Sequence, residues 1–435
     1  MSATPSAETG ARREAARALA EQGRMLEAEH AFTDLLRDVP DDGDALNFLA
    51  ICAHERRRFD EAIGLLERAH RAHPDDATTL TNLGVLHRER GQLDAAHAAL
   101  HEAVGRAPEF FVARLRLGEV LEALGRADQA LPAYFGAMVT AQNRGQWISD
   151  ATTPPGLRPL VLHAVRVVAE GRRRLFSALL QPLRDRHGSA PLARVERCLA
   201  MYLGDLRIEY PDPRQRPKFL YFPDLPTVRF FDRDLFPWYA DLEAQTAAIR
   251  DEMLAVLAED RGFEPFLGHI EDQRTLQDYL RGDRGTPAWN AYFFHRHGER
   301  QVANAQRCPR TAAILDALPL CRIREHAPEV CFSVLTPGSH ILPHHGVTNT
   351  RAVTHLALIV PSDCALVVAG EPRSWQAGRC FTFDDTFEHE AWNRSADTRV
   401  VLLMDVWNPY LSEVERDAVT QLIGAIGDFN RVAGV

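Results

Sequence analysis

The chain of 435 residues is short of three features, each of which would point to a class of protein. The first is lysine, because Lys218 is the one lysine and the rest of the 50 basic residues are arginine. This preference is typical of a GC-rich bacterial genome and says little about function. Acidic residues outnumber basic ones and give a net charge of −10, so the sequence does not indicate a surface that binds nucleic acid.

Paired cysteines and long hydrophobic runs are the other two. The seven cysteines are scattered and odd in number, and none forms a Cys-x-x-Cys pair, which argues against a disulfide framework and a structural zinc ribbon. No run approaches the ~18–20 apolar residues of a transmembrane helix. The first residues also lack the apolar segment of a secretory signal. We therefore expect a cytoplasmic protein with neither a membrane nor a nucleic acid as its partner.

What is present is ordinary for soluble protein, with 46% hydrophobic and 25% charged residues, and the length predicts about two to three domains. The first third of the chain repeats itself. Pro40, Pro74 and Pro108 lie 34 residues apart. Two further positions recur in the same step: a turn position, occupied by Gly23, Arg57, Gly91 and Gly125, and a small residue, occupied by Ala28, Ala62, Ala96 and Ala130.

This 34-residue period resembles the tetratricopeptide repeat, in which helix hairpins stack because no hairpin buries its apolar face alone. We predict a disordered N-terminus at residues 1–10 and an all-α repeat superhelix at residues 11–140. The concave groove of such a superhelix either holds a peptide or protein partner or is only a consequence of folding. The sequence does not choose between these readings.

Beyond residue 140 the period is lost. Residues 141–215 are predicted to form a helical linker region with two helices between about 158 and 205. A Pro-rich, aromatic stretch then marks a boundary, and one helix is expected at 239–258. The next part contains five short β-rich runs, which predict an antiparallel barrel or sandwich: EVCFSVLT, THLALIVP, CALVVAG, RCFTFDD and TRVVLLMDVW. We assign residues 216–410 to this domain and 411–435 to a C-terminal helix, an α+β multidomain chain.

Three histidines are the first candidates for chemistry. His344 and His345 lie between a proline and a glycine in ILPHHGVTNT, and His389 follows in FDDTFEHEAWN. Iron sites often use a His, a carboxylate two residues later and a distant second His, but the chain has Gly346 at the carboxylate position. Strand alternation would point His389 inward and turn its neighbouring glutamates away. On spacing alone, an inward His is more often a hydrogen-bonded core residue than a ligand.

The residues around the histidines resemble a known family. The segments FSVLTPGSHILPHHGVTNTRAVTHLALIVP and SWQAGRCFTFDDTFEHEAWNRSADTRVVLLMDVWNP are similar to the aspartyl/asparaginyl β-hydroxylases, over roughly residues 285–410. The resemblance implies a double-stranded β-helix of the jelly-roll or cupin type. It also implies an oxygenase that uses Fe(II) and 2-oxoglutarate, hydroxylates Asp or Asn of a polypeptide, and releases succinate and CO₂. This family lacks the metal-binding carboxylate, so Gly346 is what the resemblance implies at that position.

Carried over by position, His344 and His389 match the iron ligands, and Ser333, His355 and Arg399 match residues that hold 2-oxoglutarate. An arginine suits the distal carboxylate because its planar fork binds two oxygens. A salt bridge with Asp384, Asp385 or Asp405 is the structural alternative for Arg399.

Some family members have a further cosubstrate arginine where this chain has Val353. Arg351 lies on the same strand face, about 6.6 Å along the strand, and either replaces that arginine or contacts the substrate. The remaining motif residues are expected to support the site without touching iron: Gly346, Asp384, Asp385, Trp392 and Asn393. We interpret His345 as a surface residue. At its turn, Gly346 is expected to adopt a positive φ angle.

Three other functions stay open. The same cofactors could act on a free amino acid, a lipid or a small natural product. The chain could be a repeat scaffold with an inactive β-domain, although His344, His389 and Arg399 argue against this. A metal-binding cupin of another chemistry would usually show a His-x-His pair with a glutamate, which is absent from the segments around His344 and His389.

Overall fold

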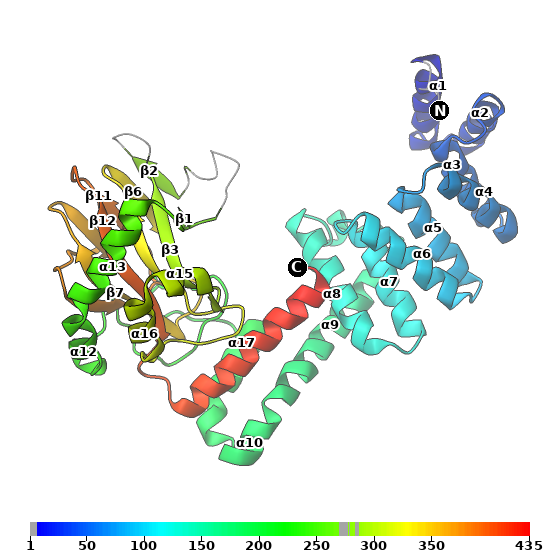
Figure 1. Cartoon of the computed structure of the whole chain (residues 1–435). Helices are drawn as coiled ribbons and strands as arrows, with labels where there is room; N and C mark the ends of the chain where they lie inside the picture. The colour runs from blue at the N-terminus through cyan, green and yellow to red at the C-terminus, as the bar shows by residue number, and fades with distance from the viewer. Residues whose placement is uncertain (1–6, 269–276, 278, 283–286) are drawn as a thin grey trace. The chain divides into compact units, whose positions relative to one another are not determined.

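The computed structural model describes residues 7–268, 277, 279–282 and 287–435 and divides the chain into two compact units (Figure 1). Unit 1 comprises Met1–Arg173 with Asp428–Val435, and unit 2 comprises Arg174–Gly427. The divisions fall inside helices α9 (Arg158–Leu179) and α17 (Glu413–Ala433). Of the N-terminal segment predicted to be disordered, residues 1–6 lie outside the described residues, and residues 7–10 belong to the first helix.

Unit 1 is an all-helical, tetratricopeptide-like region built from consecutive hairpins. Its helices before α9 are α1 (Ala7–Glu21), α2 (Met25–Asp38), α3 (Gly43–Glu55), α4 (Phe59–Ala72), α5 (Ala77–Glu89), α6 (Leu93–Arg106), α7 (Phe111–Ala123) and α8 (Ala127–Asn143). The repeated alanines are all at most 1% exposed, because they lie where neighbouring helices meet. The repeated prolines each follow a helix end by two residues, where they stop the helix from continuing.

The turns between paired helices explain the repeated glycine. Gly23, Gly91 and Gly125 have φ angles of 75°, 73° and 74°, in the left-handed region that glycine adopts without a steric penalty. Arg57 takes the same conformation with φ of 59°. The hairpin turn therefore fixes the backbone at this position whatever residue the repeat supplies.

Unit 2 begins with α10 (Gln181–His187) and α11 (Ala193–Leu203) and continues with α12 (Tyr239–Ala244) and α13 (Thr246–Glu259). The single helix predicted at 239–258 is thus two helices, because the backbone turns at Gln245 and the Thr246 hydroxyl donates to the Glu243 carbonyl at 2.6 Å. The helices α15 (Val302–Arg307) and α16 (Pro309–Asp316) follow the first strands. No helix in the described part of the chain is long and apolar enough to cross a lipid bilayer.

The strands of unit 2 form two antiparallel sheets. The seven-stranded sheet has the order β1-β3-β5-β12-β7-β10, with β4 paired to β3, and the five-stranded sheet has the order β2-β6-β11-β8-β9. The bounds are β1 (Glu264–Pro265), β2 (Leu280–Gly282), β3 (Trp289–Arg296), β4 (Glu299–Arg300), β5 (Val330–Leu335), β6 (Ser339–His344), β7 (Arg351–Ile359), β8 (Cys364–Val368), β9 (Glu371–Arg373), β10 (Cys380–Phe383), β11 (His389–Asn393) and β12 (Arg399–Trp407). Each of the five β-rich runs contains a strand: β5, β7, β8, β10 and β12.

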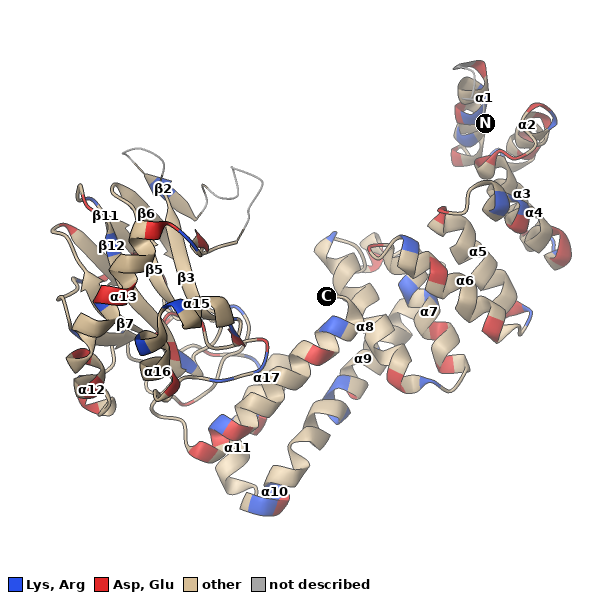
Figure 2. Ribbon diagram, in the orientation of Figure 1, with Lys and Arg blue, Asp and Glu red and all other residues tan. Residues whose placement is uncertain are grey.

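Alternation along the central strands separates a core from a cavity. In β12, Val400, Leu402 and Met404 pack with helices α12, α13 and α16 on the outer face of the seven-stranded sheet. The intervening Val401 and Leu403 face the other sheet, together with residues of β6, β8 and β11. Both faces of the sheet are therefore covered, which explains why its strands are nearly continuous apolar runs with few charged residues (Figure 2).

Candidate active site

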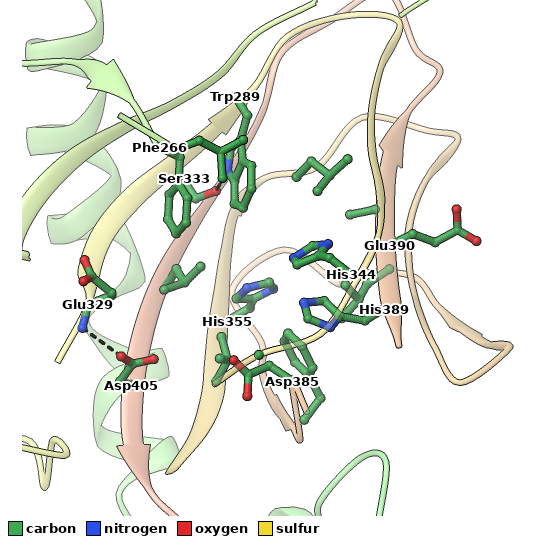
Figure 3. A pocket seen from close by; sticks show the side chains of 18 of the residues that line it. Phe266, Trp289, Glu329, Ser333, His344, His355, Asp385, His389, Glu390 and Asp405 are labelled. Atoms are coloured by element: carbon green, nitrogen blue, oxygen red, sulfur yellow. Dashed lines mark hydrogen bonds between the residues drawn. The ribbon is translucent and has the colours of Figure 1, made fainter. Parts of the chain in front are cut away.

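The two predicted iron ligands lie side by side on neighbouring strands. His344 ends β6 and His389 begins β11, and the two residues are direct partners in the antiparallel ladder. Their ring centroids are 4.1 Å apart, and both side chains line a cavity of about 240 Å³ between the sheets (Figure 3). Glu390 points away from the pair and bonds to His340 at 2.6 Å, as the strand alternation predicted.

Both imidazoles are held in one tautomer by the backbone. Nδ1 of His344 donates to the carbonyl of Leu342 at 2.8 Å, and Nδ1 of His389 donates to the carbonyl of Phe387 at 3.0 Å. The remaining nitrogen, Nε2, therefore carries a lone pair in each ring. Burial lowers the pKa of His344 to about 3, assisted by the charge of His389, and burial lowers the pKa of His389 to about 4. Both rings are neutral at pH 7, as metal ligands must be.

Gly346 lies directly against Asp385. The amide of Gly346 donates to the Asp385 carbonyl at 2.7 Å, and a Cβ atom added to Gly346 would overlap the Asp385 carboxylate. The predicted positive φ angle is wrong, since Gly346 is not among the glycines with left-handed backbone. Glycine is required here for space. A carboxylate at residue 346 would have to share the volume that Asp385 already fills.

Asp385 faces the cavity with an incomplete set of hydrogen bonds. Its Oδ1 atom is buried and has no partner within the described residues, and burial raises the pKa of the carboxyl. Asp384 does not line the cavity, because it accepts from Gln215 at 2.8 Å and from the Thr386 amide at 2.9 Å. Burial raises the pKa of Asp384 to about 7. Of the two predicted supporting aspartates, only Asp385 reaches the site.

Trp392 and Asn393 also lie outside the cavity. Trp392 packs against His340, and Asn393 donates to the carbonyls of Leu335 and Asp397 at 3.0 and 2.8 Å. Trp392 therefore packs on the outer face of β11, whereas Asn393 ties the end of β11 to β5 of the other sheet. His345 is half-buried, and its Nδ1 donates to the Thr386 carbonyl at 3.1 Å, so its interpretation as a plain surface residue is wrong.

The predicted cosubstrate residues Ser333, His355 and Arg399 all line the cavity. Arg399 is 2% exposed, and its Nη1 lies 3.3 Å from the Ser333 carbonyl and 3.4 Å from the Ser333 hydroxyl. Its Nε atom has no partner in the described ranges, and burial lowers its pKa to about 10. The alternative of a salt bridge with Asp384, Asp385 or Asp405 is wrong, because no described carboxylate pairs with Arg399. A buried cation without an anion is costly unless a ligand supplies one.

Arg351 has a partner of its own. Its guanidinium forms a salt bridge with Asp405, which also accepts from the Glu329 amide at 2.8 Å (Figure 3). Arg351 and Val353 both line the cavity on β7, on the same face as predicted. The pairing with Asp405 reduces the charge that Arg351 can offer to a second anion.

Four residues at the site were not singled out from the sequence: Phe266, Trp289 and Lys218 line the cavity, and Trp375 contacts His355. Trp375 donates its indole N–H to Nδ1 of His355 at 3.2 Å, and Trp289 donates to the Ser333 hydroxyl at 3.0 Å. Phe266 stacks on Trp289 at 4.0 Å between ring centroids. Lys218 also lines the cavity, and among the described residues no carboxylate pairs with its ammonium. Because Lys218 is the one lysine in the sequence, it could have been singled out as a candidate site residue. The aromatic residues could not, because their sequence pattern is the same as that of core residues.

Parts of the chain are similar to known proteins. A family profile described as Aspartyl/Asparaginyl beta-hydroxylase matches residues 243–409, and one described as Tetratricopeptide repeat matches residues 13–77 and 81–145. The chain is 34% identical over 208 residues to aspartate beta-hydroxylase domain-containing protein 2 of Mus musculus, covering 47% of this chain and 58% of the relative.

Two other relatives carry different names. Aspartyl/asparaginyl beta-hydroxylase of Homo sapiens is 33% identical over 179 residues, which cover 40% of this chain and 22% of the relative. Ornithine lipid ester-linked acyl 2-hydroxylase of Rhizobium tropici is 33% identical over 185 residues, covering 42% and 61%. The chain therefore spans less than two thirds of the length of each of these relatives. Its residues 13–77 and 81–145 are similar to tetratricopeptide repeats, and its residues 243–409 are similar to the aspartyl/asparaginyl β-hydroxylases.

Proposed function

We propose that unit 2 is an Fe(II)- and 2-oxoglutarate-dependent hydroxylase built on a double-stranded β-helix. Strands β5 to β12 support this fold, because β5, β12, β7 and β10 are consecutive in one sheet, and β6, β11, β8 and β9 are consecutive in the other. The same strand order is expected of a jelly roll. It brings β6 and β11 together, and with them His344 and His389.

The observation that carries the proposal is the pair of Nε2 lone pairs in a cavity that also contains Arg399, an arginine with no carboxylate partner among the described residues. Two neutral imidazoles suit a divalent iron ion. No set of three or more His, Cys, Asp or Glu side chains in the described residues is arranged to hold a metal, so the protein would supply two ligands. The buried, unpartnered Oδ1 of Asp385 is suited to accept a hydrogen bond from water beside the ion.

Arg399 and Ser333 would hold the 2-oxoglutarate at the other end of the cavity. The dianionic cosubstrate would satisfy the buried guanidinium. When bound, iron and 2-oxoglutarate supply the oxidising power for C–H hydroxylation with dioxygen, and succinate and CO₂ are released. The chain's own residues position the two groups, and the apolar walls formed by Leu366, Phe383 and Leu403 exclude water from them.

The substrate that we favour is an Asp or Asn residue of a polypeptide. Lys218 and Arg351 give the cavity two cations besides Arg399, which suits a substrate carboxylate. A lipid is the second candidate, because Phe266, Leu267, Tyr279 and Trp289 form an apolar wall and one relative is named for an acyl hydroxylase. Succinate release measured separately with Asp/Asn peptides, free amino acids and acyl lipids distinguishes these substrates.

The first test concerns the metal. His344→Ala or His389→Ala should abolish Fe(II)-dependent succinate formation and binding of Mn(II), while the circular dichroism spectrum is kept, because one imidazole is too few to hold the ion. His345→Ala is the matched control, since its ring bonds to a carbonyl outside the cavity. Equal loss in all three variants, or in none, would exclude the assignment.

The second test concerns the cosubstrate. Truncating one partner of a buried, charged pair typically costs ~2–5 kcal/mol, so Arg399→Ala should weaken 2-oxoglutarate binding more than about tenfold and leave Mn(II) binding nearly unchanged. Arg351→Ala should affect substrate saturation more than 2-oxoglutarate binding, because Arg351 is already paired with Asp405. Unaltered 2-oxoglutarate binding by Arg399→Ala would refute the role of Arg399.

A further inference from the structure

Trp375 touches two of the three residues that are expected to hold the cosubstrate, His355 and Arg399. It lies between β9 and β10 and is 6% exposed. Its indole N–H is 3.2 Å from Nδ1 of His355, and the guanidinium of Arg399 lies over its ring, 5.0 Å from the centroid. One side chain therefore contacts His355 with its edge and Arg399 with its face.

The edge contact determines the tautomer of His355. An indole N–H donates and never accepts, so Nδ1 of His355 must be the acceptor. A neutral imidazole has one proton, which is then on Nε2. The ring is neutral because burial, together with the charge of Arg399, holds the pKa of His355 well below its ordinary value. Nε2 is buried and makes no hydrogen bond to any described residue, so its N–H is available to a ligand.

The three imidazoles of the cavity thus divide into two kinds. His344 and His389 donate Nδ1–H to carbonyls and present lone pairs, whereas His355 accepts at Nδ1 and presents an N–H. A lone pair suits a cation, and an N–H suits an anion. The difference arises from the partner of each Nδ1, a backbone carbonyl in two cases and an indole in the third.

The face contact acts on Arg399. A guanidinium over an indole ring is attracted by the negative face of the ring, and this contact restricts where the planar group can lie. Trp289 orients Ser333 by a hydrogen bond. Its indole N–H donates to the Ser333 hydroxyl oxygen at 3.0 Å, so the hydroxyl hydrogen is free to donate to a ligand. The anion end of the cavity consequently presents only donors.

We propose that Trp375 is a positioning residue for 2-oxoglutarate: its N–H makes His355 an Nε2–H donor, and its ring seats Arg399 beside that donor. The inference rests on the proposed function for the identity of the anion. It adds that the indole N–H, and not only the bulk of the ring, is needed, because the other tautomer of His355 would aim a lone pair at an anionic oxygen.

The test separates the N–H from the ring. Trp375→Phe keeps an aromatic face for Arg399 and removes the donor. Titration calorimetry with 2-oxoglutarate, on the full chain loaded with Mn(II) under anaerobic conditions, should show binding about five- to tenfold weaker, the loss expected for one fixed hydrogen bond. Mn(II) binding should be unchanged. Trp238→Phe is the matched control, because Trp238 packs against Phe236 and Tyr239 away from the cavity and its replacement should leave 2-oxoglutarate binding unaltered.

A second measurement does not depend on cosubstrate binding. In chain labelled with ¹⁵N-histidine, the resonances that disappear in His355→Gln should show a protonated Nε2 and an unprotonated Nδ1, and Trp375→Phe should produce a mixture of tautomers. A protonated Nδ1 in the wild-type chain would overturn the inference. So would equal 2-oxoglutarate affinity in Trp375→Phe and wild type. If wild type shows the stated tautomer but binds no 2-oxoglutarate, the proposed function fails, and with it the role of Trp375 toward that ligand.

Discussion

Gly346 and Asp385 show how one missing side chain shapes the site at the scale of the residue. The Asp385 carboxylate occupies the space that any Cβ at residue 346 would need. The position that provides a metal-binding carboxylate in many iron sites is therefore filled by the carboxylate of Asp385, which lines the cavity.

The first prediction follows from this contact. Gly346→Ala and Gly346→Asp should each lower stability by about 1–3 kcal/mol, because the buried Asp385 must move, and neither should raise activity. The free energy of unfolding, measured with urea, and succinate formation provide the check. The double variant Gly346→Ala with Asp385→Ala removes the overlap and should recover part of the stability lost in Gly346→Ala. A Gly346→Asp chain that is as stable as wild type and more active would contradict this account.

The second prediction concerns the pH dependence of stability. Burial raises the pKa of Asp384 to about 7, so the folded chain keeps this proton at pH values where the unfolded chain, with an aspartate pKa near 3.9, has lost it. Because of Asp384, the free energy of unfolding should fall as the pH rises from about 4 to about 7. The slope should not exceed ~1.4 kcal/mol per pH unit, and the fall should be complete above about pH 7. Asp384→Asn should remove this slope.

Urea unfolding of wild type and Asp384→Asn between pH 4 and 8 measures the difference. The stability of the variant relative to wild type should rise with pH across the window and then level off. Asp241→Asn, at an exposed position on α12, serves as the control and should give a flat difference. A flat difference for Asp384→Asn as well would mean that Asp384 is ionised in the folded chain throughout the range.

At the scale of the element, each repeat turn requires one residue with a left-handed backbone. This residue is glycine in three of the turns, and in the turn before α4 it is Arg57, with φ of 59°. A left-handed backbone destabilises the folded chain by roughly 1–2 kcal/mol when the residue is not glycine. Glycine avoids this cost, but it loses more conformational freedom on folding, which lowers stability by about 0.5–1 kcal/mol.

Arg57→Gly should therefore stabilise the helical unit by about 0.5–1 kcal/mol, the difference between these two effects. The helical signal at 222 nm during urea unfolding is a suitable measurement. Gly91→Ala is the matched opposite change, since no atom lies within 4 Å of the added Cβ and only backbone strain is tested. It should be destabilising. A destabilised Arg57→Gly chain would show that the arginine side chain contributes more than its backbone costs.

At the scale of the whole molecule, all residues proposed to bind cofactors belong to unit 2. All residues that line the cavity lie between Lys218 and Asp405, and this range lies within unit 2, which runs from Arg174 to Gly427. A chain of residues 174–427 should accordingly bind Mn(II) and 2-oxoglutarate with the affinity of the full chain. It should consume 2-oxoglutarate slowly without substrate.

Hydroxylation of the true polypeptide substrate should fall in the same truncated chain, because the repeat unit would no longer contribute binding energy. Succinate release with and without the peptide measures both effects. Unchanged turnover of the peptide after truncation would assign the repeats to another partner. Loss of 2-oxoglutarate binding would show that the cavity depends on unit 1.

The sequence determined the features that arise from local patterns. The 34-residue period, the buried alanines and the five β-rich runs follow from propensity and alternation, which act within a few residues and are readable without tertiary contacts. The inward direction of His389 follows from the same rule along a strand. The grouping of His344, His389, Ser333, His355 and Arg399 came from resemblance, and the structure brings these five residues to one cavity.

Only the tertiary structure decided what depends on neighbours distant in sequence. The overlap of Gly346 with Asp385, the pairing of Arg351 with Asp405 and the bond from Trp375 to His355 join residues of different strands or loops. Each fixes a charge, a volume or a tautomer, and these properties depend on atoms a few ångströms away in space. A histidine in a sequence has two equivalent tautomers. The backbone carbonyls and the indole that the fold places beside Nδ1 choose between them.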